Sequence, residues 1–200
     1  MTKVSKGLRS KWVALEVAKV AEVYVARYLE WKRPGVRADV ARLEFDSRGV
    51  LRQNHWDDGD IKVTYPSGVI HYNEVKWHDY FYTGRRDWPH WDFIVDAKPT
   101  FDAKQRKPDW YFFVNVDGSY IGQLSVRASV DLYHEVERTC KYTGKRKLFY
   151  SMKKRDMGSH VMFSKIEPEF RDAFPLVTMG KKELTKTMEA KVDAAIRGLG

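Results

Sequence analysis

The stretch DGDIKVTYPSGVIHYNEVKW, residues 58–77, predicts a β-hairpin, and the interpretation of the whole chain depends on it. Its turn is the loop 66–68, where proline presets φ at the first position and glycine accepts positive φ at the third. This loop sets the strand register so that Asp60 faces Glu74. Like charges directly opposed on neighbouring strands destabilise a sheet, so an acidic pair at this position needs an explanation.

Alternation of side chains along the strands gives the hairpin two faces. One face gathers Asp60, Glu74 and Lys76. Carboxylates about 5 Å apart can hold a small cation such as Mg²⁺, which prefers oxygen ligands and uses one or two carboxylates. An ammonium group beside the cation can orient a water molecule or stabilise charge on a phosphate, and burial is expected to lower its pKa. The other face is mostly apolar, is expected to point to the core, and consists of Ile61, Val63, Tyr65, Val69, His71, Asn73, Val75 and Trp77.

This constellation resembles the PD-(D/E)XK nuclease superfamily, which has the restriction-endonuclease-like fold. Residues 10–135 are similar to it in layout, with a leading helix, a meander that carries the site and a further strand. The resemblance implies an α/β (α+β) fold with a central mixed β-sheet flanked by helices, and Mg²⁺-dependent hydrolysis of phosphodiester bonds, with Mn²⁺ as a substitute. It implies that Asp60, Glu74 and the Val75 carbonyl bind the metal and that Lys76 is the catalytic lysine.

The first metal ligand has two competitors in the sequence. Asp57 and Asp58 lie close to Asp60, and a two-residue slip of the strand would exchange Asp58 for Asp60. Period and register favour Asp60. The residue before it is Gly59 rather than the proline of the family's name, a departure that many members share.

Other polar residues are candidates for supporting roles. Some members of the superfamily, including archaeal Holliday-junction resolvases, add a glutamate from the first helix, and Glu22 is our choice here, with Glu16 as the alternative. Gln123 on a later strand and His78 beyond the lysine are candidates to assist. The chain has no HExxH motif and no Cys/His spacing typical of zinc sites.

The formal net charge of +9 and the pI near 9.5 favour a polyanionic partner. We expect DNA, with RNA left open, and the resemblance to resolvases suggests branched or distorted DNA. The segment WHDYFYTGRRDWPHWDF mixes aromatic and basic residues, as single-strand binding surfaces do. A nucleic-acid-binding protein without catalysis is the alternative function. The expected nucleic-acid contacts are Arg85, Arg86, Lys145, Arg146, Lys147, Lys153, Lys154 and Arg155.

The chain divides by composition into a nuclease-like core, residues 1–140, and a basic extension with a terminal helix, residues 141–200, packed on the same domain. No apolar run is long enough to span a membrane and Cys140 is the only cysteine, so we expect a cytoplasmic protein, associated with the nucleoid if it is bacterial or from a phage. A homodimer is another expectation, because many such nucleases pair subunits. The terminal helix offers Leu184, Met188, Val192 and Ile196 as an interface.

The remaining elements are expected from periodicity and turn signals. Helices are predicted at residues 10–30, 132–138 and 181–200. Strands are predicted at residues 40–45, 49–56, 109–115 and 119–126. Residues 77–109 show no clear period.

Overall fold

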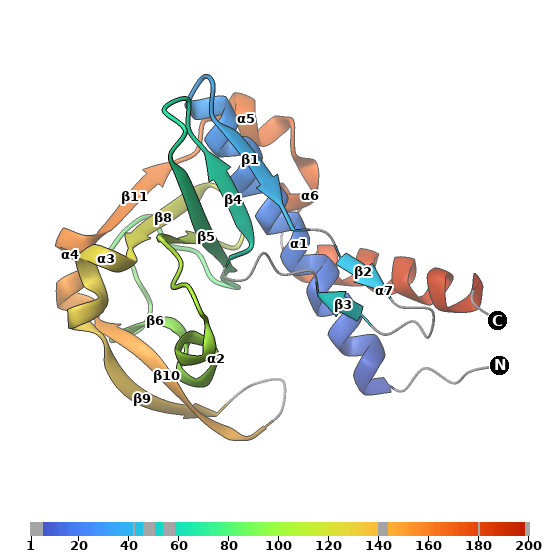
Figure 1. Cartoon of the computed structure of the whole chain (residues 1–200). Coiled ribbons are helices and arrows are strands. Elements are labelled where there is room, and N and C mark those ends of the chain that lie inside the picture. The colour runs from blue at the N-terminus through green and yellow to red at the C-terminus, as the bar shows by residue number, and fades with distance from the viewer. Residues whose placement is uncertain are drawn as a thin grey trace.

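The fold is described by a computed structural model covering residues 6–41, 43–45, 51–53, 59–139, 144–179 and 181–198. Within these residues a six-stranded sheet has the order β1-β4-β5-β7-β8-β11 (Figure 1). β5 pairs with β7 in parallel, whereas all other neighbours are antiparallel. The sheet is therefore mixed, as predicted. Its strands are Arg37–Val40, Ile61–Thr64, Ile70–Trp77, Trp110–Val114, Tyr120–Ser125 and Val161–Lys165.

The predicted hairpin register is confirmed for residues 61–64 against residues 70–73. β4 and β5 pair antiparallel with Ile61 opposite Asn73 and Thr64 opposite Ile70. In the turn, Gly68 has a φ of 80°, which only glycine adopts without strain. The Tyr65 amide donates to the Val69 carbonyl at 2.9 Å and closes the loop. Local turn chemistry has therefore fixed the alignment of the two strands.

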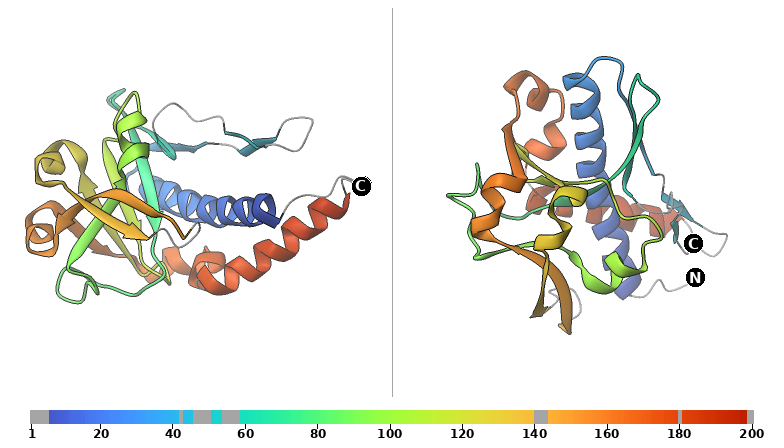
Figure 2. Two further views of the ribbon diagram at one scale, coloured as in Figure 1. Left: turned by 90° about the horizontal axis from the view of Figure 1, so that it is seen from below. Right: turned by 60° about the vertical axis from the view of Figure 1, so that its left-hand side comes forward.

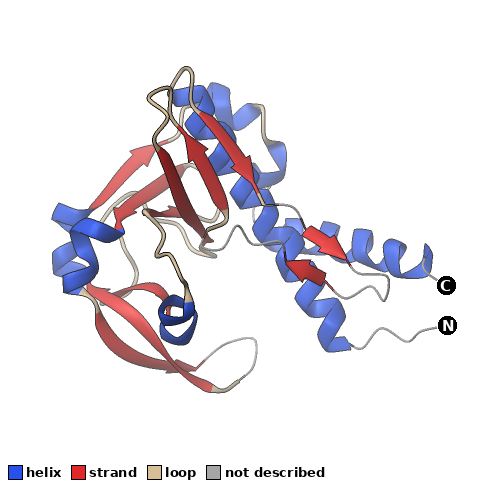
Figure 3. Ribbon diagram, in the orientation of Figure 1, coloured by secondary structure: helices blue, strands red, loops and turns tan. Residues whose placement is uncertain are grey.

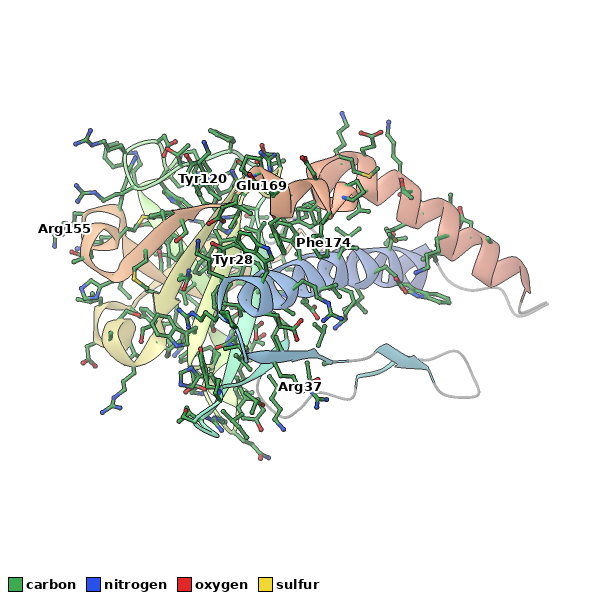
Figure 4. All side chains as sticks on the ribbon, turned by 90° about the horizontal axis from the view of Figure 1, so that it is seen from above. Tyr28, Arg37, Tyr120, Arg155, Glu169 and Phe174 are labelled. Atoms are coloured by element: carbon green, nitrogen blue, oxygen red, sulfur yellow. The ribbon has the colours of Figure 1, made fainter. Side chains whose placement is uncertain are left out.

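Helices cover one face of the sheet (Figures 1 and 2). The long helix α1, Lys6–Lys32, runs beside α7, Lys181–Gly198, and the short helices α5, Pro168–Asp172, and α6, Pro175–Thr178, pack near its C-terminal half. The core on this face joins Tyr24 of α1 to Ile61 and Val63 of the hairpin. Figure 4 shows Tyr28 of α1 and Phe174 between these helices. Both hairpin residues come from the face predicted to be apolar.

The opposite face is covered by a smaller sheet with the order β6-β10-β9 (Figure 3). Its strands are Asp92–Ala97, Arg146–Lys153 and His134–Thr139. The core between the two sheets includes Phe93, Tyr111, Phe113, Leu124 and Met152, each 0% exposed. The short helices at its border are α2, Lys98–Ala103, α3, Val126–Ser129, and α4, Met157–His160, with 3₁₀ turns at Val130–Leu132 and Lys154–Asp156.

Two sequence predictions differ from the observed elements. Residues 132–138 do not form a helix, because HEVERT at 134–139 alternates with period two and pairs with β10 as strand β9. The strand predicted at residues 40–45 is divided into the end of β1 and the separate strand β2, Leu43–Phe45. β2 pairs with β3, Leu51–Gln53, and the turn predicted between them lies outside the described residues.

Residues beyond 140 belong to the same sheets as the earlier ones. β10 pairs with β6 and β9, and β11 pairs with β8. In α7, Leu184, Met188 and Val192 are buried in the helical core of this chain, so they are not available as a dimer interface. The homodimer itself stays a prediction. Across the part of the chain that the structure describes, no helix is long and apolar enough to cross a membrane.

Candidate active site

The hairpin holds Asp60 in place through the backbone of β5. The Asp60 amide donates to the Asn73 carbonyl at 2.8 Å, and the Val75 amide donates to Asp60 Oδ2 at 2.8 Å. Asp60, the residue before β4, is thus bonded to β5 through both its backbone and its carboxylate. The Val75 carbonyl as a metal ligand stays a prediction.

Gly59 explains the missing proline in front of Asp60. A Cβ atom at this position would lie 2.9 Å from the Asn73 carbonyl oxygen and 3.0 Å from its amide nitrogen. Both neighbours are backbone atoms of β5, which cannot move aside without breaking the sheet. In this chain the approach to Asp60 therefore requires a residue without a side chain.

Glu74 is held between two lysines. Lys76 Nζ lies 2.7 Å from Glu74 Oε1, and Lys104 Nζ lies 2.6 Å from Glu74 Oε2. Lys76 is on the same strand face, whereas Lys104 follows helix α2 and comes from a distant part of the sequence. The contact between Glu74 and Lys76 agrees with the face assigned to both from alternation.

A further acid, Asp96 of β6, joins the cluster from the smaller sheet. Its side chain is about 6% exposed and lies 3.3 Å from Lys76 Nζ and 3.5 Å from Lys104 Nζ. Asp96 Oδ2 also accepts a hydrogen bond from the Tyr111 hydroxyl at 2.8 Å, and Oδ1 accepts one from the Ala97 amide at 2.8 Å. The two sheets are therefore joined by a buried polar network at the candidate site.

Glu22 reaches the same region from helix α1. It is buried, 6% exposed, and pairs with Lys19, which also donates to the Ala41 carbonyl at 2.6 Å. The Ala41 amide in turn donates to the Asp60 carbonyl at 3.2 Å, so this chain of contacts connects α1 to the backbone of Asp60. Glu16 lies elsewhere, paired with Lys191 of α7 at 2.9 Å.

The carboxyl groups differ in their pKa values because their neighbours differ. Burial, together with the nearby charges of Glu74 and Glu22, raises the pKa of Asp60 to about 8. Burial also raises the pKa of Glu22, even though Lys19 opposes this. For Glu74 burial acts in the same direction, but Lys76 and Lys104 outweigh it and lower its pKa to about 2.

The prediction that burial lowers the pKa of Lys76 is wrong. Burial does act in that direction, but the carboxylates of Glu74, Asp96 and Asp60 outweigh it and raise the pKa of the ammonium group above its ordinary value. Lys76 therefore carries a positive charge at neutral pH. It can stabilise anions, and it is a poor general base.

The donors fit a hard divalent cation in chemistry. Carboxylate oxygens are the ligands that Mg²⁺ prefers, and a cation beside Asp60 would offset the burial and the repulsion that raise its pKa. Among the described residues, no three acidic, histidine or cysteine side chains are already arranged around a common point as a metal-binding group. Lys76 and Lys104 already supply part of the positive charge that a cation would bring, because they neutralise Glu74 and Asp96.

The predicted nucleic-acid contacts fall into two groups. The first group surrounds one pocket and consists of Arg85, Arg86, Lys153, Lys154 and Arg155. Arg155 is labelled in Figure 4, at the end of the molecule opposite α7. Lys145, Arg146 and Lys147 lie at the other end of β10, where Arg146 pairs with Glu137 of β9. Residues 148–152 of β10 lie between the two groups.

The supporting candidates do not join the acidic cluster. Gln123 is opposite Phe112, whose side chain packs in the helical core, so it lies on the other sheet face from Glu74. His78 packs with Tyr80 and Trp88, at ring-centroid distances of 4.8 and 5.2 Å. Asp57 and Asp58 lie outside the described residues.

Sequence reasoning missed Asp96 and Lys104. One signal for Asp96 was present: it is a single acid inside the apolar run FIVDA, and acids are rarely buried unless they are paired. Lys104 gave no signal, because its meeting with Glu74 depends on how β6 and α2 fold back over the sheet.

Comparisons of the chain with the profiles of known protein families, with curated proteins and with solved structures found no match. The interpretation of this site therefore depends on its residues and their geometry.

Proposed function

We propose that the protein is a Mg²⁺-dependent DNA endonuclease, in which the acidic cluster at the β4–β5 hairpin cleaves phosphodiester bonds. The observation that supports this most is the buried charged cluster in which Glu74 contacts Lys76 and Lys104, close enough to Asp60 for the charges of Glu74 and Glu22 to raise its pKa further. Repulsion among buried carboxylates is costly and is typical of sites that bind cations or perform catalysis. The order of a helix, a meander and a parallel strand also agrees with the resemblance seen in the sequence.

Asp60 and Glu74 are the residues that would hold Mg²⁺, with Glu22 beside them. When bound, Mg²⁺ polarises a phosphate oxygen and makes a neighbouring water more acidic. Lys76 presents an ammonium group that stays protonated at neutral pH, and it stabilises the negative charge that develops on the phosphate during attack. Asp96 positions Lys76 through the contact at 3.3 Å. Lys76 and Lys104 together keep Glu74 ionised.

The test is a cleavage assay on supercoiled, linear, branched and single-stranded DNA with Mg²⁺. Wild type is expected to cut at least one of these forms, and a chelator is expected to stop it. Glu74→Gln is expected to lose about 100-fold or more in rate, because the metal would lose a charged carboxylate ligand. The matched control is Glu137→Gln, a strand glutamate whose partner Arg146 lies at the surface. If wild type cuts no DNA form, or if Glu74→Gln cuts as fast as Glu137→Gln, the enzyme proposal fails.

A second candidate function is nucleic-acid binding without catalysis. The pocket surrounded by five cationic side chains favours it, because this surface needs no metal to attract phosphates. Both candidates predict binding to DNA, but only the nuclease predicts cleavage that depends on Glu74. The same panel therefore separates them.

A further inference from the structure

A pocket of about 580 Å³ lies outside the acidic cluster, between the loop after β5 and the end of β10. The loop contributes Arg85, Arg86 and Trp91. Lys153 is the last residue of β10, and Lys154 and Arg155 follow in the 3₁₀ turn. A large aromatic ring is thus combined with several positive charges in one concave surface.

Trp91 is the most exposed large apolar side chain of the described residues, at 86%. Leaving an indole in water has a cost that a stacked partner would remove. Trp88 in the same loop is buried and packs on Phe93 at 4.7 Å between ring centroids, so the loop supplies its own core anchor without Trp91. The fold therefore does not need Trp91, and a ligand is a physical reason for its position.

Backbone contacts hold the pocket in shape. The Lys154 amide donates to the Trp91 carbonyl at 2.9 Å, and its Nζ donates to the Trp88 carbonyl at 2.6 Å. Arg85 Nη1 donates to the Arg155 carbonyl at 3.2 Å. These bonds tie the loop to the end of β10, so the positive charges are arranged before any ligand arrives.

The charge of the pocket is not cancelled from within. Asp92 is its one acidic lining residue, and that carboxylate is already paired with Arg138 at 2.9 Å. Among the described residues, neither Arg86 nor Lys153 forms an ion pair with an acid, although Lys153 lies opposite Asp92 in the strand register. A ligand that carries phosphates would therefore find unpaired cations around an aromatic surface.

The pocket is connected to the acidic cluster by strand β6. Asp92, next to Trp91, is the first residue of β6, and Asp96, which contacts Lys76, lies four residues further along. A strand rises about 3.3 Å per residue, so the two positions are about 13 Å apart. A DNA strand covers this distance in about four nucleotides at the duplex rise of about 3.4 Å per nucleotide, and in fewer where the strand is unpaired and extended.

We propose that this pocket holds one unpaired nucleotide of a DNA strand, with its base stacked on Trp91 and its neighbouring phosphates on Arg86 and Lys153. The inference deepens the proposed function and rests on it for the identity of the polymer. It names the substrate class: DNA with an unpaired base a few nucleotides from the bond that is cut. Aromatic stacking with flanking cations is how single strands are held without sequence readout.

The test measures binding in a chelating buffer, so that it does not depend on cleavage. Fluorescence anisotropy follows a labelled thymidine oligonucleotide of roughly 15 nucleotides, at the upper end of a single binding site. A blunt duplex and an RNA strand of equal length are the comparison probes. Wild type is expected to bind the DNA strand more tightly than either.

Trp91→Ala is expected to weaken binding of the single strand about tenfold, since stacking contributes about 1–3 kcal/mol per base and 1.4 kcal/mol is a factor of ten. Trp91→Phe is expected to retain affinity within about threefold, because it keeps a ring. Phe81→Ala is the matched control, an aromatic residue of the same loop that is 53% exposed and outside the pocket. Thermal unfolding of each variant checks that the fold is intact.

The charges are tested by salt dependence. The double variant Arg86→Ala with Lys153→Ala is expected to reduce the slope of log K against log salt by about 1.4, or about 0.7 for each phosphate that is no longer neutralised. The control is Lys182→Ala with Lys186→Ala, which removes two exposed cations from α7. An equal change of slope in the two double variants would show that only net charge matters and would overturn the proposal.

Three other results would also overturn it: single-strand affinity unchanged in Trp91→Ala, equal losses in Trp91→Ala and Phe81→Ala, or tighter binding of the duplex or the RNA. Failure of the pocket is distinguishable from failure of the nuclease. If binding depends on Trp91 but the protein never cuts DNA, the pocket proposal stands and the nuclease proposal fails. If cleavage depends on Glu74 but binding does not depend on Trp91, the nuclease proposal stands and the pocket proposal fails.

Discussion

The acidic cluster and the basic pocket are two charged regions built on opposite principles. In the acidic cluster, carboxylates and lysines are largely withdrawn from water and hold one another, as Glu74 does with Lys76 and Lys104. In the pocket the cations are mostly exposed and stand around Trp91. Removing one member of the first group leaves a charge unpaired in a poorly solvated place, whereas water replaces a member of the second.

The largest expected difference comes from the same substitution in both regions. Lys76→Met is expected to lower the free energy of unfolding by about 3 kcal/mol, because Glu74 and Asp96 lose a buried partner. Lys153→Met is expected to change it by less than about 0.5 kcal/mol. Urea denaturation in a chelating buffer measures both, and equal losses would contradict the comparison.

A second prediction concerns pH and the unpaired acid of the cluster. Asp60 has a pKa of about 8 in the folded protein, against 3.8 as its ordinary value. The folded state thus binds this proton more tightly than the unfolded state, and the resulting stability is present below pH 3.8 and lost as pH rises to about 8. Asp60→Asn is expected to be more stable than wild type at pH 8, and no more stable at pH 3.8.

Urea denaturation of wild type and Asp60→Asn across this pH range measures the difference, with Asp39→Asn as the control for an aspartate paired at the surface. A difference that does not depend on pH would show that Asp60 is not strained by its neighbours. In the cleavage assay Asp60→Asn is expected to be inactive, so that one substitution raises stability and removes activity.

A third prediction compares the glycines in front of the two regions. Gly59→Ala is expected to destabilise the fold by about 2 kcal/mol, because the added methyl group would lie 2.9 Å from the Asn73 carbonyl oxygen. Gly84, just before Arg85, has open space within 4 Å of the position that a methyl group would take, so Gly84→Ala is expected to be neutral. Thermal unfolding distinguishes them, and equal midpoints would mean that the approach to Asp60 is looser than described.

The smallest expected effect is stabilisation by metal. At ten times its dissociation constant, Mg²⁺ is expected to add about 1.4 kcal/mol to the stability of wild type. Asp60→Asn is expected to lose this gain, whereas Trp91→Ala keeps it, because the pocket holds no acid that is free to bind a cation. A titration of the unfolding midpoint with Mg²⁺ measures it. The same gain in all three proteins would place the ion elsewhere.

The sequence by itself determined the hairpin that carries the candidate site. Turn chemistry at residues 66–68 and strict alternation set the register of residues 61–64 against 70–73. That register predicts that Asp60, Glu74 and Lys76 share one face. It also predicted α1, α7 and the strands β7 and β8 from periodicity. These features depend on contacts between residues that are close along the chain, and such contacts leave a readable pattern.

The tertiary structure alone decided what surrounds that hairpin. Asp96 and Lys104 join Glu74 because β6 and α2 fold back over the sheet. Residues 77–109 show no clear period from which this arrangement could be predicted. The pKa of Lys76 rises rather than falls for the same reason, since the direction of the pKa shift depends on how many carboxylates approach from other elements. Arg86 and Lys153 meet at Trp91 across 66 intervening residues of chain. Long-range contacts of this kind follow from packing, which local sequence patterns do not encode.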